Sequence, residues 1–158
     1  MTVLWHSVMD PPDRSATLAH LREVFVELAV SAQQLIWLAQ QAEIEGLPDE
    51  AAALRAKAAA DSGHAQAILD ALAELDPGAV TDAMPHQVRS PDRHGDLVIA
   101  EVVLDSVVPS ASAFVERLDA LAATTRGDGL DLVADSLEAI ATSQRRHVDA
   151  IHQSTRAR

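Results

Sequence analysis

Two segments of the chain match each other at the same spacing: Gly46-Leu47 followed by Asp61-Ser62-Gly63-His64, and Gly129-Leu130 followed by Gln144-Arg145-Arg146-His147. In each segment the histidine lies 18 residues after the glycine, and a polar residue precedes the histidine by three positions. The two copies are 83 residues apart. This internal repeat predicts a duplicated pair of helices with polar residues at equivalent positions.

Around these segments, apolar residues recur with the period of an α-helix in four stretches, residues 15–45, 49–75, 96–124 and 130–155. Gly46 and Pro48 separate the first two stretches, and Gly127-Asp128-Gly129 separates the last two. Pro109 lies inside the third stretch, where it is expected to kink the helix because proline has no N–H to donate.

The segment 76–95 contains three prolines and is predicted to be a loop. About 20 residues can span roughly 60 Å when extended, which exceeds the roughly 40–45 Å length of a helix of about 30 residues. The loop is therefore long enough to cross the molecule and leave the second and third helices parallel. The predicted fold is a single all-α domain over residues 1–158, a four-helix bundle with one long crossover between helices 2 and 3.

Composition excludes several classes of function. The net charge of −12 argues against partners that carry phosphate, both nucleic acid and anionic membrane surfaces. The chain has no cysteine, so it has no disulfide and no thiolate metal site. The N-terminal residues lack the features of a signal peptide, and no apolar run is long enough to span a membrane. A cytoplasmic location is expected.

Four polar residues are predicted to lie at one level of the bundle. Asp61, Gln144 and His147 fall on the apolar seams of their helices, and His64 lies at the edge of one. A polar side chain in the core costs roughly 1–3 kcal/mol unless it finds a partner. We expect these side chains to hydrogen-bond to one another or to bind something.

The pattern resembles the rubrerythrin branch of the ferritin-like superfamily. The resemblance rests on residues 42–47 and 58–65 in the first half, and on Gly129-Leu130 and residues 140–147 in the second. It implies that His64 and His147 match the two ligand histidines of a di-iron centre, that Asp61 stands at one glutamate position and that Gln144 replaces the other. The carboxylate position of the first helix falls on Leu28, and that of the third falls near Ser110 and Ala111.

The resemblance by itself implies an iron-dependent oxidoreductase or a peroxide scavenger. However, a site that in this family has about four carboxylates keeps one, and two iron ions need that negative charge. The rubredoxin-like iron domain is excluded because the chain has no cysteines. We therefore expect a depleted site without a working di-iron centre.

Three hypotheses for the polar layer remain open, and with them the question of whether the protein is an enzyme. In the first, the four residues form a hydrogen-bond network left over from a lost site in a non-catalytic interaction protein. In the second, His64, His147 and Asp61 hold one divalent ion (Fe, Zn or Mn). In the third, small residues leave a pocket in the bundle centre for an organic molecule, with His147, His64, Asp61 and Gln144 available for metal-independent acid–base chemistry.

The first helix carries a second apolar stripe, formed by Val26, Val30, Trp37 and Ile44. A helix that is apolar on two faces has another element packed on the second one. The sequence predicts a homodimer through this stripe; the alternative is that the N-terminal segment Val3-Leu4-Trp5 folds over it.

Overall fold

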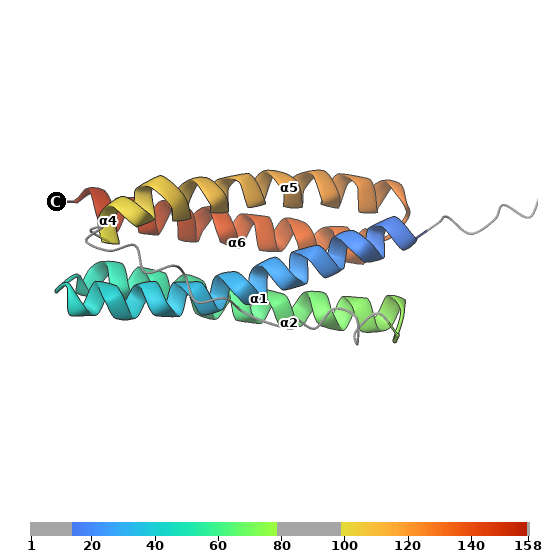
Figure 1. The fold of residues 1–158 in the computed structure, drawn as a ribbon. Coiled ribbons are helices and arrows are strands. Elements are labelled where there is room, and N and C mark those ends of the chain that lie inside the picture. Colours follow the sequence, from blue (N-terminus) through green and yellow to red (C-terminus); the bar gives the residue numbers. More distant parts are fainter. Residues whose placement is uncertain (1–13, 79–98, 158) are drawn as a thin grey trace, which may run out of the picture.

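All regular structure in the described part of the chain is helical (Figure 1). The computed structural model describes residues 14–78 and 99–157. Its elements are α1 (Ser15–Ile44), α2 (Pro48–Leu75), α4 (Ile99–Val102), the π-helix η1 (Val103–Val107), α5 (Val108–Gly127) and α6 (Asp131–Arg156). The predicted all-α class with four long helices is confirmed.

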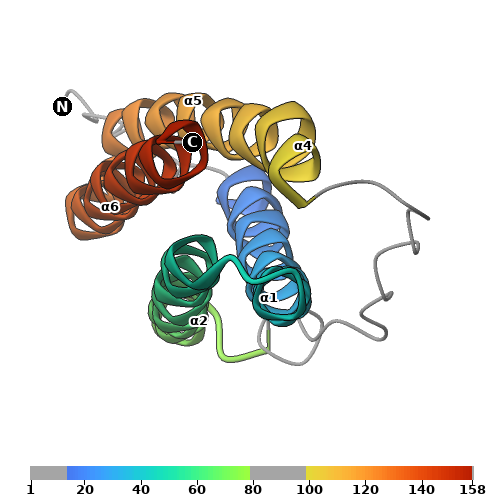
Figure 2. The same cartoon turned by 90° about the vertical axis from the view of Figure 1, so that its left-hand side faces the viewer.

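The helices form two antiparallel hairpins, α1 with α2 and α5 with α6, and α2 also packs against α6 (Figure 1; Figure 2). In Figure 1, α2 and α5 run in the same direction. The predicted crossover comprises residues 76–95. All of it after residue 78 lies outside the described residues. The long crossover and the ferritin-like class stay predictions.

The two hairpin turns have the same backbone geometry. Gly46 and Gly129 both have a φ of 76°, in the left-handed region that glycine adopts without strain. The N–H of Leu47 donates to the carbonyl of Ala42, and the N–H of Leu130 donates to the carbonyl of Thr125, the equivalent atoms 83 residues later. Each first helix therefore ends in a Schellman motif, which satisfies its last carbonyl groups.

The repeat extends to the core. Equivalent positions of α2 and α6 carry the same apolar residues, and these are buried in both copies: Leu54 and Leu137, Ala58 and Ala141, Ile68 and Ile151. Side chains from all four long helices meet in one cluster that includes Leu28, Ile68, Leu118 and Leu137. A second cluster, with Leu35, Leu54, Val103 and Ile151, fills the other end. Along α2 and α6, Asp61 and Gln144 lie where the two clusters meet.

The third helix departs from regular α-helical bonding directly before Pro109. Over Val103–Val107 it is a π-helix, in which the N–H of Val108 donates to the carbonyl of Val103. Because Pro109 has no N–H, the regular bonding of this turn cannot be completed. Directly before Pro109 the helix is thus widened for one turn, a feature that is frequent at functional sites. The predicted kink stays a prediction.

The predicted helix bounds agree with the structure except in the third helix. The prediction that this helix ends at Thr124 is wrong, because α5 continues to Gly127. The residue that adopts the left-handed conformation is Gly129, not Gly127, so the turn begins later. The predicted start at residue 96 lies outside the described residues, where the structure begins again at Ile99.

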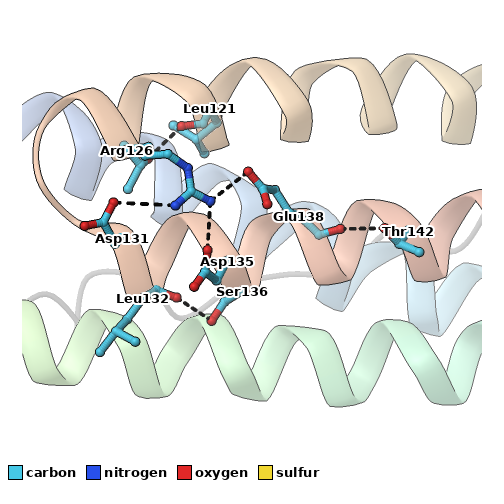
Figure 3. Close-up of polar contacts among 9 residues, drawn as sticks. Leu121, Arg126, Asp131, Leu132, Asp135, Ser136, Glu138 and Thr142 are labelled. Carbon is cyan, nitrogen blue, oxygen red and sulfur yellow. Dashed lines mark hydrogen bonds and ion pairs between the residues drawn. The ribbon is translucent and has the colours of Figure 1, made fainter.

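Ion pairs at the surface join the helices of each hairpin. Arg126 at the end of α5 donates to Asp135 and Glu138 of α6, at 2.7 Å and 2.9 Å, and lies 3.5 Å from Asp131 (Figure 3). In the first hairpin, Arg55 of α2 donates to Glu43 of α1. These pairs bridge the two helices of each hairpin at the surface.

The second stripe of α1 is partly covered. Val26, Val30 and Trp37 are half-buried, whereas the side chain of Ile44 is 79% exposed. The alternative cover, Val3-Leu4-Trp5, lies outside the described residues. The homodimer stays a prediction.

Candidate functional site

The carboxylate of Asp61 is the centre of a buried polar cluster. Asp61 lies in the middle of α2 and is fully buried. Its Oδ2 accepts hydrogen bonds from Ser31 Oγ and Lys57 Nζ, both at 2.7 Å, and its Oδ1 accepts one from Gln144 Nε2 at 2.6 Å. The donors come from three helices, so the cluster ties α1 and α6 to α2.

Lys57 supplies the positive charge of this cluster. It is the only lysine of the chain, since the other eleven Lys and Arg positions are arginine. It lies one turn before Asp61, where an i, i+4 pair faces one side of the helix. The side chains of Lys57 and Asp61 are 4% and 0% exposed, so both charges are out of water. Each charge is therefore compensated by the other.

The ammonium group of Lys57 has more N–H donors than the one hydrogen bond to Asp61 uses. An ammonium carries three N–H groups. Among the described residues, the side chain of Lys57 donates to Asp61. Two N–H groups of this buried ammonium thus have no acceptor among the described residues. Gln144 is similar on the acceptor side, because its Oε1 is buried and no described residue donates a hydrogen bond to it.

The two histidines lie beside the cluster and are half-buried. Burial lowers the pKa of His64, and His147 and Lys57 lower it further while Asp61 opposes them. Burial also lowers the pKa of His147, with Lys57 and Arg146 adding to the effect and Asp61 opposing it. Both imidazoles are therefore neutral at pH 7. The Nδ1 of His64 is buried and has no hydrogen-bond partner within residues 14–78 and 99–157.

A cavity of about 210 Å³ opens between α1 and the η1–α5 part of the third helix. Lys57 and Asp61 are the buried charged groups of its lining, and Glu27, Ser106 and Ser110 are exposed at its rim. The described residues that line it are Glu27, Leu28, Val30, Ser31, Gln34, Leu35, Leu38, Lys57, Asp61, Ser106, Val107, Ser110, Ala111 and Phe114. The cavity is thus an apolar space with a polar, charge-paired inner end.

The structure brings together only part of the predicted site. Asp61 and Gln144 meet as expected, and the pocket contains Leu28, Ser110 and Ala111. His64, Gln144 and His147 do not line this cavity. The expected interaction between Asp61 and His64 is electrostatic, since the hydrogen bonds of Asp61 go to other residues.

Two residues of the cluster, Lys57 and Ser31, were not predicted from the sequence. Lys57 offers a signal: it is the sole lysine, it precedes Asp61 by four positions and it lies next to the apolar seam. Ser31 offers none, because only the packing of α1 on α2 brings its hydroxyl to Asp61.

The repeat is broken at this cluster. The residue 83 positions after Lys57 is Ile140, and the residue 83 positions after Ser31 is Phe114; both are buried. The second half therefore contributes Gln144 to the cluster and apolar side chains around it. The polar side chains of the cluster that line the cavity therefore all come from the first half of the repeat; these are Ser31, Lys57 and Asp61.

The residues present do not fit the iron centre that the resemblance implies. The one carboxylate of the layer already accepts three hydrogen bonds, and an ammonium lies 2.7 Å from its Oδ2. A metal ion there would meet the positive charge of Lys57. Within residues 14–78 and 99–157, no three His, Asp or Glu side chains are grouped so that they could hold a metal ion. The single-metal hypothesis for His64, His147 and Asp61 gains no support.

Comparisons with models of protein families, with curated proteins and with solved structures gave no match to this chain. None of the helices in the described part is both long enough and apolar enough to cross a lipid bilayer. The function therefore has to be argued from the cluster and the cavity.

Proposed function

We propose that this protein binds a small organic molecule, without a metal ion, in the cavity between α1 and α5. The observation that carries the proposal is the buried ammonium of Lys57 at the inner end of the cavity, with two N–H groups that no described residue accepts. A buried polar group without a partner is costly. A ligand that accepts those hydrogen bonds removes the cost.

The size and lining of the cavity suit such a ligand. An apolar cavity of about 150 Å³ holds benzene, and this cavity is about 210 Å³. Ligand sites combine apolar walls with a few placed polar groups. Leu28, Leu35 and Phe114 supply the walls, and Lys57 and Ser31 supply the polar groups.

Binding is better supported than acid–base catalysis by the histidines. A general base has to reach the proton that it takes, and neither His64 nor His147 lines the cavity. Binding is also better supported than an iron-dependent oxidoreductase, because Lys57 supplies the cation that Asp61 needs. A relic network in a non-catalytic interaction protein accounts for the hydrogen bonds of Asp61 but not for the cavity beside them.

We also propose that the fold is a derived ferritin-like bundle with a long crossover and that it acts as a homodimer in the cytoplasm. The matching Schellman turns and the facing Asp61 and Gln144 support the first part. The exposed Ile36 and Ile44 on α1 support the dimer. A molar mass by light scattering equal to that of one chain would rule the dimer out.

A cavity-filling substitution tests the binding function. Ala111→Leu places three extra carbon atoms against the cavity, whereas Ala113→Leu adds the same atoms at an exposed position of α5 that does not line it. We expect a panel of small aromatic and cyclic compounds to shift the backbone NMR signals of Ser31, Leu35 and Lys57. Ala111→Leu should abolish those shifts and Ala113→Leu should keep them. If no compound shifts these signals, the binding function is wrong.

A further inference from the structure

The charged groups at the inner end of the cavity cancel. Lys57 and Asp61 form a pair at 2.7 Å, and both are buried. An anionic ligand placed there meets the carboxylate of Asp61, and a cationic ligand meets the ammonium of Lys57. Because Lys57 and Asp61 together carry no net charge, a charged group that enters this space loses its hydration without gaining a counterion. The inner end of the cavity therefore favours a neutral group.

The hydrogen-bonding capacity at this end is mostly that of a donor. Lys57 has two N–H groups that no described residue accepts, whereas Asp61 already accepts three hydrogen bonds. Ser31 uses its hydrogen on Asp61 and keeps lone pairs only. A ligand oxygen that accepts from Lys57 completes this set. Carbonyl oxygens of ketones, esters and amides have that property and carry no net charge.

The rest of the cavity is apolar because the second half of the repeat carries apolar residues where the first half is polar. Phe114 replaces Ser31 at the equivalent position and lines the cavity with Ala111 and Val107. Arg117 covers the ring of Phe114 at 5.6 Å and is held by Glu27 of α1 at the rim. This arrangement provides a hydrophobic wall opposite Lys57.

We propose, on the basis of the binding function above, that the ligand is a neutral carbonyl compound whose oxygen accepts from Lys57 Nζ and whose hydrocarbon body lies against Phe114 and Ala111. Binding consists of hydrogen bonding and apolar contact, with no covalent step.

Four probes with the same aromatic ring test the proposal: acetophenone, ethylbenzene, benzoate and benzylammonium. Labelling the protein with ¹³C,¹⁵N-lysine gives a single Nζ resonance, because Lys57 is the only lysine. We expect acetophenone to shift this signal and to bind about tenfold or more tightly than ethylbenzene, as a hydrogen bond from a charged donor implies. Benzoate and benzylammonium should bind at least tenfold more weakly than acetophenone.

The double variant Lys57→Met/Asp61→Asn is the matched control, since it removes both charges and leaves neither unpaired. It should bind acetophenone and ethylbenzene equally and keep the far-ultraviolet circular dichroism of the unmodified protein. Equal binding of the two probes by the unmodified protein, or tightest binding of benzoate, would overturn the carbonyl proposal and leave the binding function standing. Failure of all four probes to bind the unmodified protein would refute the binding function itself.

Discussion

The guanidinium of Arg126 donates to the carboxylate of Glu138 at 2.9 Å, and the two residues lie 83 positions after an oppositely charged pair, Glu43 and Arg55, which makes the same contact in the first hairpin. Figure 3 shows the pair of the second hairpin. The two hairpins thus share an ion pair with exchanged charges. Position and partner are the same, and only the sign at each end differs. The structural repeat is therefore more complete than the residue identities indicate.

The exchanged pair predicts that the first hairpin accepts the charge order of the second. Glu43→Arg or Arg55→Glu alone places like charges together and should lower the midpoint of urea unfolding slightly. The double variant Glu43→Arg/Arg55→Glu should return it to the original value, because the pair is restored in reverse. The differences should shrink in 1 M NaCl, which screens exposed charges. A double variant less stable than both single variants would contradict the equivalence of the two pairs.

The matching turns predict matching costs. Gly46→Ala and Gly129→Ala each force a Cβ into the left-handed region and should each lower the free energy of unfolding by about 1–2 kcal/mol. Urea titration followed by circular dichroism measures both.

Gly63 provides the control, because it lies inside α2, is exposed and has open space around an added Cβ. Gly63→Ala should raise the free energy of unfolding by about 0.5–1 kcal/mol. A clear difference between the losses at Gly46 and Gly129 would mean that the turns are not equivalent.

The helices and the buried layer could be predicted because they depend on periodicity. Asp61 and Gln144 interrupt apolar seams of known period, so their burial and mutual contact follow from the sequence. The cavity could not be placed in the same way. It lies between α1 and α5, on the side of Asp61 that carries Lys57. Periodicity within one helix does not predict which neighbouring helices leave space between them.

Lys57 shows why the site predicted from the sequence was incomplete. A lysine beside a seam commonly extends its charged end into water, so spacing alone predicts an exposed cation. Here α1 covers it, and Ser31 and Asp61 complete the cluster. The predicted acid–base chemistry of the histidines assumed that both halves of the repeat contribute equally to the site. The buried charges, Lys57 and Asp61, both lie in the first half.

The histidines predict a dependence of stability on pH. Folding lowers the pKa of His64 and His147 from the ordinary value of 6.5, so the unfolded chain binds more protons than the folded one in acid. The free energy of unfolding should therefore have its full value above about pH 7. It should decrease as the pH falls through about 6.5 toward about 5. Lys57 and Arg146 oppose protonation and Asp61 favours it.

Urea unfolding at a series of pH values between 5.5 and 7.5 measures this dependence. The variant His64→Gln/His147→Gln should flatten it. A stability that rises on acidification would show that the two histidines gain protons more readily in the folded state.

The strongest prediction concerns the buried pair itself. Lys57→Met leaves the carboxylate of Asp61 buried without its counterion and should lower the free energy of unfolding by about 3–5 kcal/mol. Lys57→Met/Asp61→Asn should recover most of that loss, because the amide that replaces the carboxylate is neutral. Arg55→Met, which removes an exposed cation from the same helix, should have little effect.

Chemical labelling checks the burial of Lys57 directly, since no other lysine competes. An N-hydroxysuccinimide ester should leave the peptide containing Lys57 unmodified in the native protein and modify it fully in 8 M urea, as measured by mass spectrometry. Rapid labelling of the native protein would place the ammonium in water, and the pairing with Asp61 would then contribute little to stability.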